Sequence, residues 1–225
     1  MRLHSAIAVL ARIRRAFRTS FSSRVLTLFV FAAFLSPVAS PDAHAGLDHP
    51  VTPTDSGIWA RKYSQALQYG VIATEIGGSL WLGGESELGL TFWQTVDSSV
   101  FSGVTAQLMK WGFCRKRPSQ ADNPNEWFKG TQYQSFPSGE VTLQASFVTP
   151  FIVNYAERNP WVWALEVLPA YAAAARVKNG AHWQTDVIAG WALGSGFGYF
   201  AAKNKTPFFL SIAPHGFVVG LHSSW

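Results

Sequence analysis

Apolar residues recur every three or four positions along most of the chain after residue 56, which is the spacing of buried or amphipathic helices. Gly, Pro and polar clusters interrupt this pattern and separate the predicted helices from one another. Five helices are predicted, at residues 57–80, 87–111, 138–157, 160–177 and 182–203. Pro150 and Pro169 fall inside two of them and are expected to kink these helices. The pattern predicts an all-α fold, a helical bundle.

Two segments depart from the helical spacing. Residues 113–137 form a polar stretch with three prolines, and a loop of this length is uncommon in a compact domain unless it has a function. The C-terminal tail changes to the spacing of strands on both sides of Pro214, His215 and Gly216. We therefore expect a small C-terminal β-hairpin.

The bundle could lie in water, against a membrane or across it. The uncharged run of the last predicted helix, Val187 to Ala202, has sixteen residues, and a spanning helix needs ~20. Gly190, Gly194 and Gly198 recur every four residues, so one face of the last helix is bare backbone that a neighbouring helix can approach closely. We favour a water-soluble or membrane-associated bundle over a polytopic one.

Residues 1–45 have the pattern of a secretory signal peptide. Six arginines precede or flank the apolar run Val25 to Leu35, and the sequence Ala-His-Ala ends at Ala45. Cleavage there would leave residues 46–225 as one helical domain in the periplasm or cell envelope. The alternative is an uncleaved membrane anchor, although the apolar run is short for one.

The distribution of charge and the cysteine content limit which partners and cross-links are expected. The formal net charge of +5 lies entirely in residues 1–45, and the remainder has twelve basic and twelve acidic side chains. A neutral domain does not favour a nucleic-acid partner. Cys114 is the only cysteine, so the chain forms no internal disulfide.

Three segments carry candidate chemistry. Lys110 and Arg117 belong to a group of four cations at a helix end, where cations can bind an anion or simply complement the helix dipole. Ser138 and Gly139 stand at a helix start, where a serine can cap the helix and backbone N–H groups can bind phosphate.

The third segment holds a histidine and an aspartate on one helix face. Because Asp186 follows His182 by four residues, its carboxylate can accept one ring N–H and leave the other nitrogen as a nucleophile or base. Such a pair is also common as a purely structural contact. The remaining histidines after residue 45 are interpreted as structural or surface residues: His49, His215 and His222.

Taken together, the three segments resemble the signature of the type 2 phosphatidic acid phosphatase family. The match consists of Lys110 with Arg117-Pro118, then Pro137-Ser138-Gly139, then Arg176 with His182 and Asp186, over about 77 residues with the family's spacings. This family shares its helical fold with bacterial class A acid phosphatases and vanadium haloperoxidases.

The resemblance implies a role for each residue. Lys110, Arg117 and Arg176, with Ser138 and the backbone at Gly139, would bind phosphate, while His182, oriented by Asp186, would attack phosphorus. It implies a metal-independent phosphatase without a cofactor, which hydrolyses phosphate esters or diphosphates through a phosphohistidine. Its substrate would be a phosphorylated lipid or a small phosphate ester, and its surface could associate with a membrane.

The sequence departs from the family at two positions. Ala175 replaces a usual serine, and Glu140 replaces the histidine that protonates the leaving oxygen. Glu140 could be a substitute acid or water-positioning base, could contact an unusual substrate, or could merely complement the helix dipole and weaken phosphate binding. As an acid it would need a proton; burial and a bound phosphate favour one, whereas the helix start and the cations oppose it.

Two rival functions stay open on the sequence. A vanadium haloperoxidase would use the same cations for vanadate, but such enzymes need the histidine that Glu140 replaces. A non-catalytic envelope protein could bind anionic lipid or dock at the outer membrane through the tail ending in Trp225. A single hairpin cannot close a barrel, which argues against docking of that kind.

Overall fold

The computed structural model describes residues 47–204, 211–213 and 216–218. The predicted signal peptide and its cleavage site at Ala45 lie outside the described residues, as do the predicted turn residues Pro214 and His215. These three interpretations therefore stay predictions.

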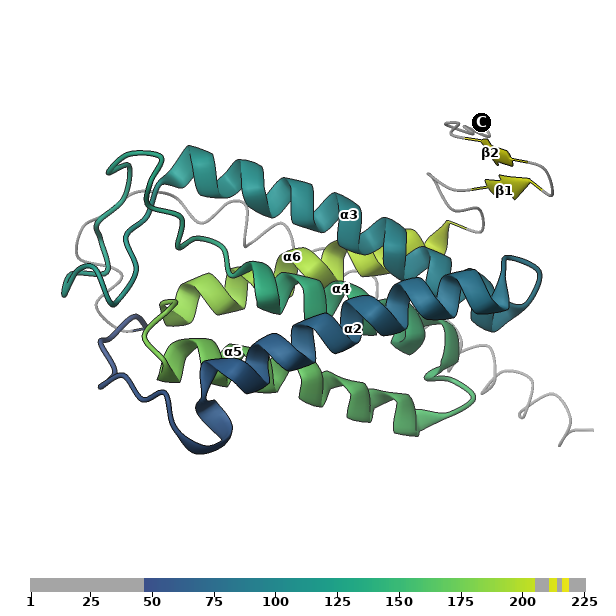
Figure 1. The fold of residues 1–225 in the computed structure, drawn as a ribbon, viewed down its shortest axis with the longest axis horizontal. Coiled ribbons are helices and arrows are strands. Elements are labelled where there is room, and N and C mark those ends of the chain that lie inside the picture. Colours follow the sequence, from purple (N-terminus) through teal and green to yellow (C-terminus); the bar gives the residue numbers. More distant parts are fainter. Residues whose placement is uncertain (1–46, 205–210, 214–215, 219–225) are drawn as a thin grey trace, which may run out of the picture. The chain divides into compact units, whose positions relative to one another are not determined.

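The described chain is helical, as the apolar spacing predicts (Figure 1). The α-helices are α2 (Arg61–Leu82), α3 (Glu87–Phe113), α4 (Gly139–Tyr155), α5 (Val167–Lys178) and α6 (Gln184–Lys203). Two 3₁₀ helices, η1 (Gly57–Trp59) and η2 (Pro160–Glu166), precede α2 and α5. Two short strands, β1 (Ser211–Ala213) and β2 (Gly216–Val218), pair in antiparallel register.

The prediction of one continuous helix over residues 160–177 was wrong. A 3₁₀ segment, η2, occupies its first part, and α5 begins only at Val167. Pro169 is consequently the third residue of α5, in the first turn, where a helix has no use for the missing N–H. The expected interior kink at Pro169 therefore has no helix interior in which to form, whereas Pro150 does lie inside α4.

The predicted first helix also has a break near its start. Residues Gly57–Trp59 are the 3₁₀ helix η1, and α2 begins after Ala60. The Asp55 carboxylate accepts a hydrogen bond from the backbone N–H of Arg61, the first residue of α2. Asp55 thus satisfies one of the N–H groups that a helix start leaves without a partner.

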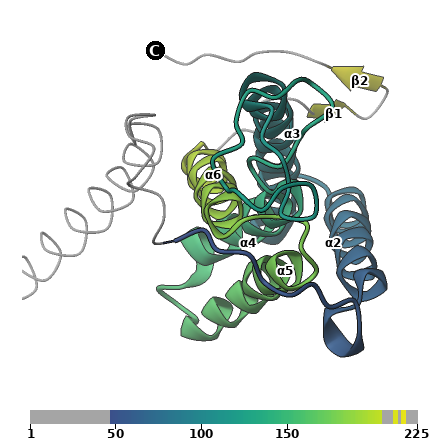
Figure 2. The same ribbon diagram turned by 90° about the vertical axis from the view of Figure 1, so that its left-hand side faces the viewer.

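Helix α4 is the centre of the bundle. It contacts α2, α3, α5 and α6, and the view along the helices in Figure 2 shows it among them. Its apolar side chains form two clusters: Phe147, Val148, Phe151 and Ile152 pack with Val71 of α2, and Val141 packs with Ala172 and Val187. Burial of these side chains supplies the hydrophobic stabilisation of the fold.

The glycine row of α6 is packed directly on α4. A methyl group at Gly190 would lie 2.5 Å from the carbonyl oxygen of Ser138, and one at Gly194 would lie 2.2 Å from that of Thr142. At Gly198 it would lie 2.6 Å from the Thr149 side chain. The expected close approach is confirmed, with α4 as the neighbour, and it sets the start of α4 against the start of α6.

No helix in the part of the chain that the structure describes is both long enough and apolar enough to cross a membrane.

Candidate active site

Segments from the whole helical domain meet at one end of the bundle. The end of α3, the starts of α4 and α6, the end of α5 and the start of α2 all lie on the left in Figure 1. The candidate residues come from these helix ends and from the loops that follow α3 and α5: Lys110, Arg117, Ser138, Gly139, Glu140, Arg176, His182 and Asp186. The fold thus gathers side chains that are up to about 77 residues apart in the chain.

The long loop between α3 and α4 packs around Arg115. The guanidinium lies 4.1 Å from the ring centre of Trp127 and donates hydrogen bonds to the carbonyl oxygen of Pro124. Phe113, Trp127 and Phe136 pack edge to face with one another. These contacts give the loop a core of its own, which holds it against the start of α6.

Asp186 is fully buried and accepts several hydrogen bonds. Its Oδ1 accepts from Arg115 Nη1 at 2.6 Å, and its Oδ2 accepts from Ser135 Oγ at 2.5 Å and from the Trp183 backbone N–H at 2.9 Å. Burial alone would raise the pKa of Asp186, but His182, Arg115 and Ser135 lower it below its ordinary value. Asp186 is therefore held as a carboxylate.

His182 faces this carboxylate through its Nδ1 atom. The distance from Nδ1 to Asp186 Oδ2 is 3.5 Å, at the long end of the hydrogen-bond range, and Nδ1 has no well-aligned acceptor. The side chain is only 4% exposed, and this burial, opposed by Asp186, lowers the pKa of His182 to about 3. The imidazole is therefore neutral near pH 7, and Nδ1 points at Asp186, which leaves Nε2 for other chemistry.

Two of the candidate cations are held by carbonyl groups rather than by acids. Lys110 Nζ donates to the carbonyl oxygens of Gln134 and Pro137, at 2.9 and 2.6 Å. Arg117 donates to the carbonyls of Ala181 and Gln134, at 3.3 and 3.4 Å. Within the described residues neither cation forms an ion pair, so both keep their full charge for an anion.

Burial shifts these cations away from their ordinary titration ranges. Burial, together with Arg117 and Arg176, lowers the pKa of Lys110 to about 8. Burial likewise lowers the pKa of Arg176 to about 10 and moves the pKa of Arg117 in the same direction. Lys110 is therefore the cation whose charge is lost first as the pH rises.

Ser138 holds its hydroxyl free at the start of α4. It is the N-cap residue, but its side chain makes no cap hydrogen bond, so the expected capping role of this hydroxyl was wrong. Instead its backbone N–H donates to the Asp186 carbonyl at 2.9 Å, which joins α4 to α6. The buried Oγ has no hydrogen-bond partner among the described residues, and at Gly139 an added methyl group would lie 3.9 Å from Lys110 Cε.

Glu140, in the first turn of α4, is paired with two arginines. Its Oε1 accepts a hydrogen bond from Arg61 Nη1, and its Oε2 lies 3.7 Å from Arg176 Nε. Both Oε2 and Arg176 Nε are buried and make no hydrogen bond in the part of the chain that the structure describes. The Glu140 side chain thus lies between two of the cations at this end of the bundle.

The amino-acid sequence gives no indication of the contacts that Arg115, Ser135 and Arg61 make in this region. Arg115 was counted only among the loop cations, although it joins Asp186 to Asp48 through hydrogen bonds of 2.6 Å each. Ser135 and Arg61 were not singled out. Their partners are 51 to 79 residues away in sequence, so no local spacing could reveal these contacts.

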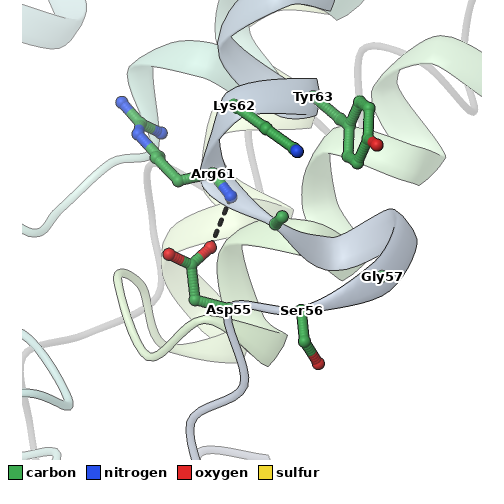
Figure 3. A pocket seen from close by; sticks show the side chains of 7 residues that line it. Asp55, Ser56, Gly57, Arg61, Lys62 and Tyr63 are labelled. Atoms are coloured by element: carbon green, nitrogen blue, oxygen red, sulfur yellow. Dashed lines mark hydrogen bonds between the residues drawn. The ribbon is translucent and has the colours of Figure 1, made fainter.

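A surface cavity of about 380 Å³ lies beside this site, at the start of α2. It is lined by Asp55, Ser56, Gly57, Ala60, Arg61, Lys62 and Tyr63 (Figure 3). Arg61 is the lining residue that also reaches Glu140. Among the described residues, no three His, Cys, Asp or Glu side chains lie close enough together to hold a metal ion.

Comparison with known protein families identifies the class of protein to which this fold and site belong. Residues 92–208 match the PAP2 superfamily, and the chain belongs to this family. The match contains every candidate residue but not Arg61 or Asp48. The resemblance inferred from the three segments is therefore confirmed.

Two known relatives show what the chain is similar to. It is 30% identical over 120 residues to an undecaprenyl-diphosphatase of Sulfolobus acidocaldarius, covering 52% of this chain and 55% of the relative. It is 32% identical over 108 residues to a lipid A 1-phosphatase of Rhizobium johnstonii, covering 46% and 43%. The chain thus spans about half the length of these relatives. No solved structure matches it.

Proposed function

We propose that this protein is a metal-independent phosphatase that removes phosphate from phosphorylated lipids through a phosphohistidine at His182. Its family and the names of its relatives, which act on lipid A and undecaprenyl diphosphate, support a lipid phosphate as substrate. Phosphate release measured separately with a monoester substrate and a diphosphate substrate distinguishes between these two kinds of substrate.

The observation that carries this proposal is the set of buried groups without partners around His182. Ser138 Oγ and Arg176 Nε are both buried, and neither makes a hydrogen bond within the described residues. Buried polar atoms usually have partners, so two unsatisfied ones in this region favour a ligand site. Because Lys110 and Arg117 form no ion pair with a described residue, the ligand that fits this site is an anion.

The proposed reaction follows from the charges of Asp186 and the cations around the neutral His182. The Nε2 atom of neutral His182 attacks phosphorus, the bond to the leaving oxygen breaks, and Asp186 stabilises the positive charge that develops on the ring. Lys110, Arg117 and Arg176 stabilise the phosphoryl oxygens in the transition state. Water then attacks the phosphohistidine and releases phosphate, which restores His182.

Glu140 is proposed as the acid and base of these two steps. In the second step its carboxylate accepts the proton of the attacking water. In the first step it must donate a proton to the leaving oxygen, so it must release its arginines and become protonated when phosphate is bound. Its position in the first turn of α4, beside Ser138 and Gly139, is the position of the family's histidine.

We further propose that the protein is exported and works at a lipid surface. Helix α3 exposes a row of apolar side chains at four-residue spacing, Val100, Val104 and Leu108, followed by Trp111, and each is about half exposed. Trp111 lies in the last turn of α3, so the row ends at the end of the helix that borders the candidate site. An acyl chain along this row would bring its phosphate toward that end of α3.

Phosphate release by the purified protein tests the enzymatic assignment. Wild-type protein should release phosphate from phosphatidic acid, isoprenyl diphosphate or lipid A, and His182→Ala should lower kcat by at least about 10³-fold because the nucleophile is removed. His49→Ala, the other described histidine, is the matched control and should keep activity. Full activity in His182→Ala would refute the assignment.

A further inference from the structure

The ion pair between Arg61 and Glu140 lies between solvent and the buried cations. The Arg61 side chain is 38% exposed, whereas those of Glu140 and Arg176 are 10% and 6% exposed. Exposure thus falls along the series from Arg61 through Glu140 to Arg176. An anion that approaches Arg176 along this series meets the Arg61–Glu140 pair first.

Arg61 is held in this position by contacts to the helix that carries Arg176. The Tyr171 hydroxyl of α5 donates to the Ile58 carbonyl of η1 at 2.5 Å, and Tyr171 stacks on Trp59 at 6.1 Å between ring centres. Asp55 accepts from the Arg61 backbone N–H, as Figure 3 shows. The start of α2 is therefore fixed to α5, and the two guanidiniums are presented to the same carboxylate.

The carboxylate satisfies these two guanidiniums incompletely. Glu140 Oε1 accepts from Arg61, but Oε2 stays 3.7 Å from Arg176 Nε, and neither of these last two atoms makes a hydrogen bond. A phosphate group has a larger charge and three acceptor oxygens, so it can bond both guanidiniums at once. A phosphate would therefore be a better partner for Arg61 and Arg176 than Glu140 is.

We propose that Arg61 binds the phosphate of the substrate. In the free protein the Glu140 carboxylate takes the place of this phosphate between Arg61 and Arg176, and an incoming phosphate displaces it. This inference rests on the proposed function, which it deepens by adding a fourth cation from outside residues 92–208. The exchange makes Glu140 an internal competitor of the substrate. It selects for groups with enough negative charge to displace a carboxylate.

Binding of inorganic phosphate to the full chain tests this exchange, with isothermal titration calorimetry on the wild type, Arg61→Ala, Glu140→Gln and the double variant. Glu140→Gln should bind phosphate about tenfold more tightly, because the competing anion is gone. Arg61→Ala should bind about tenfold more weakly than wild type. In the double variant, loss of Arg61 should still weaken binding about tenfold relative to Glu140→Gln.

The double variant distinguishes whether Arg61 binds phosphate itself or only pairs with Glu140. If Arg61 serves only to hold Glu140, its removal has no effect once residue 140 is glutamine, and that result overturns the proposal. Lys62→Ala removes one positive charge at the neighbouring position and leaves the Arg61–Glu140 ion pair in place. It should change the affinity for phosphate by less than about twofold. An equal loss in Lys62→Ala and Arg61→Ala would also overturn it, as would unchanged affinity in Glu140→Gln or no phosphate binding in any variant.

Phosphatase assays on the same preparations distinguish the two proposals. Wild-type activity that depends on His182, together with an ineffective Arg61→Ala in the Glu140→Gln background, would refute the exchange and leave the enzyme assignment intact. The predicted order of affinities in a protein that releases no phosphate would refute the enzyme assignment and leave the exchange intact. Thermal unfolding of each variant verifies that it is folded.

Discussion

Lys110 combines burial with an unpaired charge, and both properties follow from its place at the end of α3. Two backbone carbonyls solvate its ammonium group at 2.6 and 2.9 Å. Carbonyl dipoles stabilise a buried cation less than a carboxylate would, so burial lowers the pKa of Lys110 to about 8. The same arrangement leaves the charge free to attract phosphate.

The pH dependence of the reaction should report this shift. Lys110 is cationic below its pKa and neutral above it, so kcat/KM, which reflects the free enzyme, should fall as the pH rises past about 8. Lys110→Arg keeps its charge at a higher pH and should move the fall upward by more than about one pH unit. Rate profiles from pH 5 to 10 measure this, and an identical fall in Lys110→Arg would exclude Lys110 as its origin.

Single residues also show where sequence reasoning succeeds. The pairing of His182 with Asp186 is readable because the two residues are only four apart in the chain, but the predicted helix start at residue 182 was wrong: α6 begins at Gln184, and His182 lies just before it. The partners of Asp186 are not readable: Arg115 lies 71 residues away and Ser135 lies 51 away, and only the packed loop brings them together. Glu140 is visible as a departure from the family, but its partner Arg61 is 79 residues away.

At the scale of elements, contact between α4 and α6 fixes the geometry of the site. The three glycines of α6 let the α4 backbone approach, and the Ser138 N–H reaches the Asp186 carbonyl at 2.9 Å. The glycine spacing was readable from sequence, but the identity of the neighbouring helix was not. Residues 160–166 were misassigned because a 3₁₀ turn and an α-helix bury apolar residues at similar spacings.

A methyl group at the glycine row should force these two helices apart. Gly194→Ala places Cβ 2.2 Å from the Thr142 carbonyl oxygen and should lower the free energy of unfolding by about 1–3 kcal/mol. Gly103→Ala on α3 meets nothing within 4 Å and should instead be neutral or stabilise by up to about 1 kcal/mol. Denaturant unfolding of both variants measures the difference, and equal stabilities would contradict this packing.

At the scale of the whole molecule, the candidate site lies where the apolar row of α3 ends. Val104, Leu108 and Trp111 are each more than half exposed, so this helix offers apolar area to a lipid surface. Apolar area removed from water contributes about 25 cal/mol per Å², and several such side chains together suffice for reversible binding. The bundle would then hold the end of α3, which borders the candidate site, near the lipid surface.

Binding to phosphatidylcholine vesicles tests this orientation for residues 46–225, the predicted mature chain. Changing Val104, Leu108 and Trp111 together to serine should weaken partitioning by at least about tenfold, because their burial in the lipid is lost. Trp81→Ser is the matched control, since Trp81 is 89% exposed but lies at the opposite end of α2 from Arg61. Equal binding by wild type and the triple variant in a sedimentation assay would rule out this surface.

The central claim is that His182 accepts the phosphoryl group, and covalent trapping tests it most directly. Wild-type protein mixed with a lipid phosphate and quenched in alkali, in which phosphohistidine survives, should carry phosphate on the peptide that contains His182, as identified by mass spectrometry. His182→Ala should carry none. Phosphate release by a wild-type protein that never acquires phosphate at His182 during turnover would contradict the account.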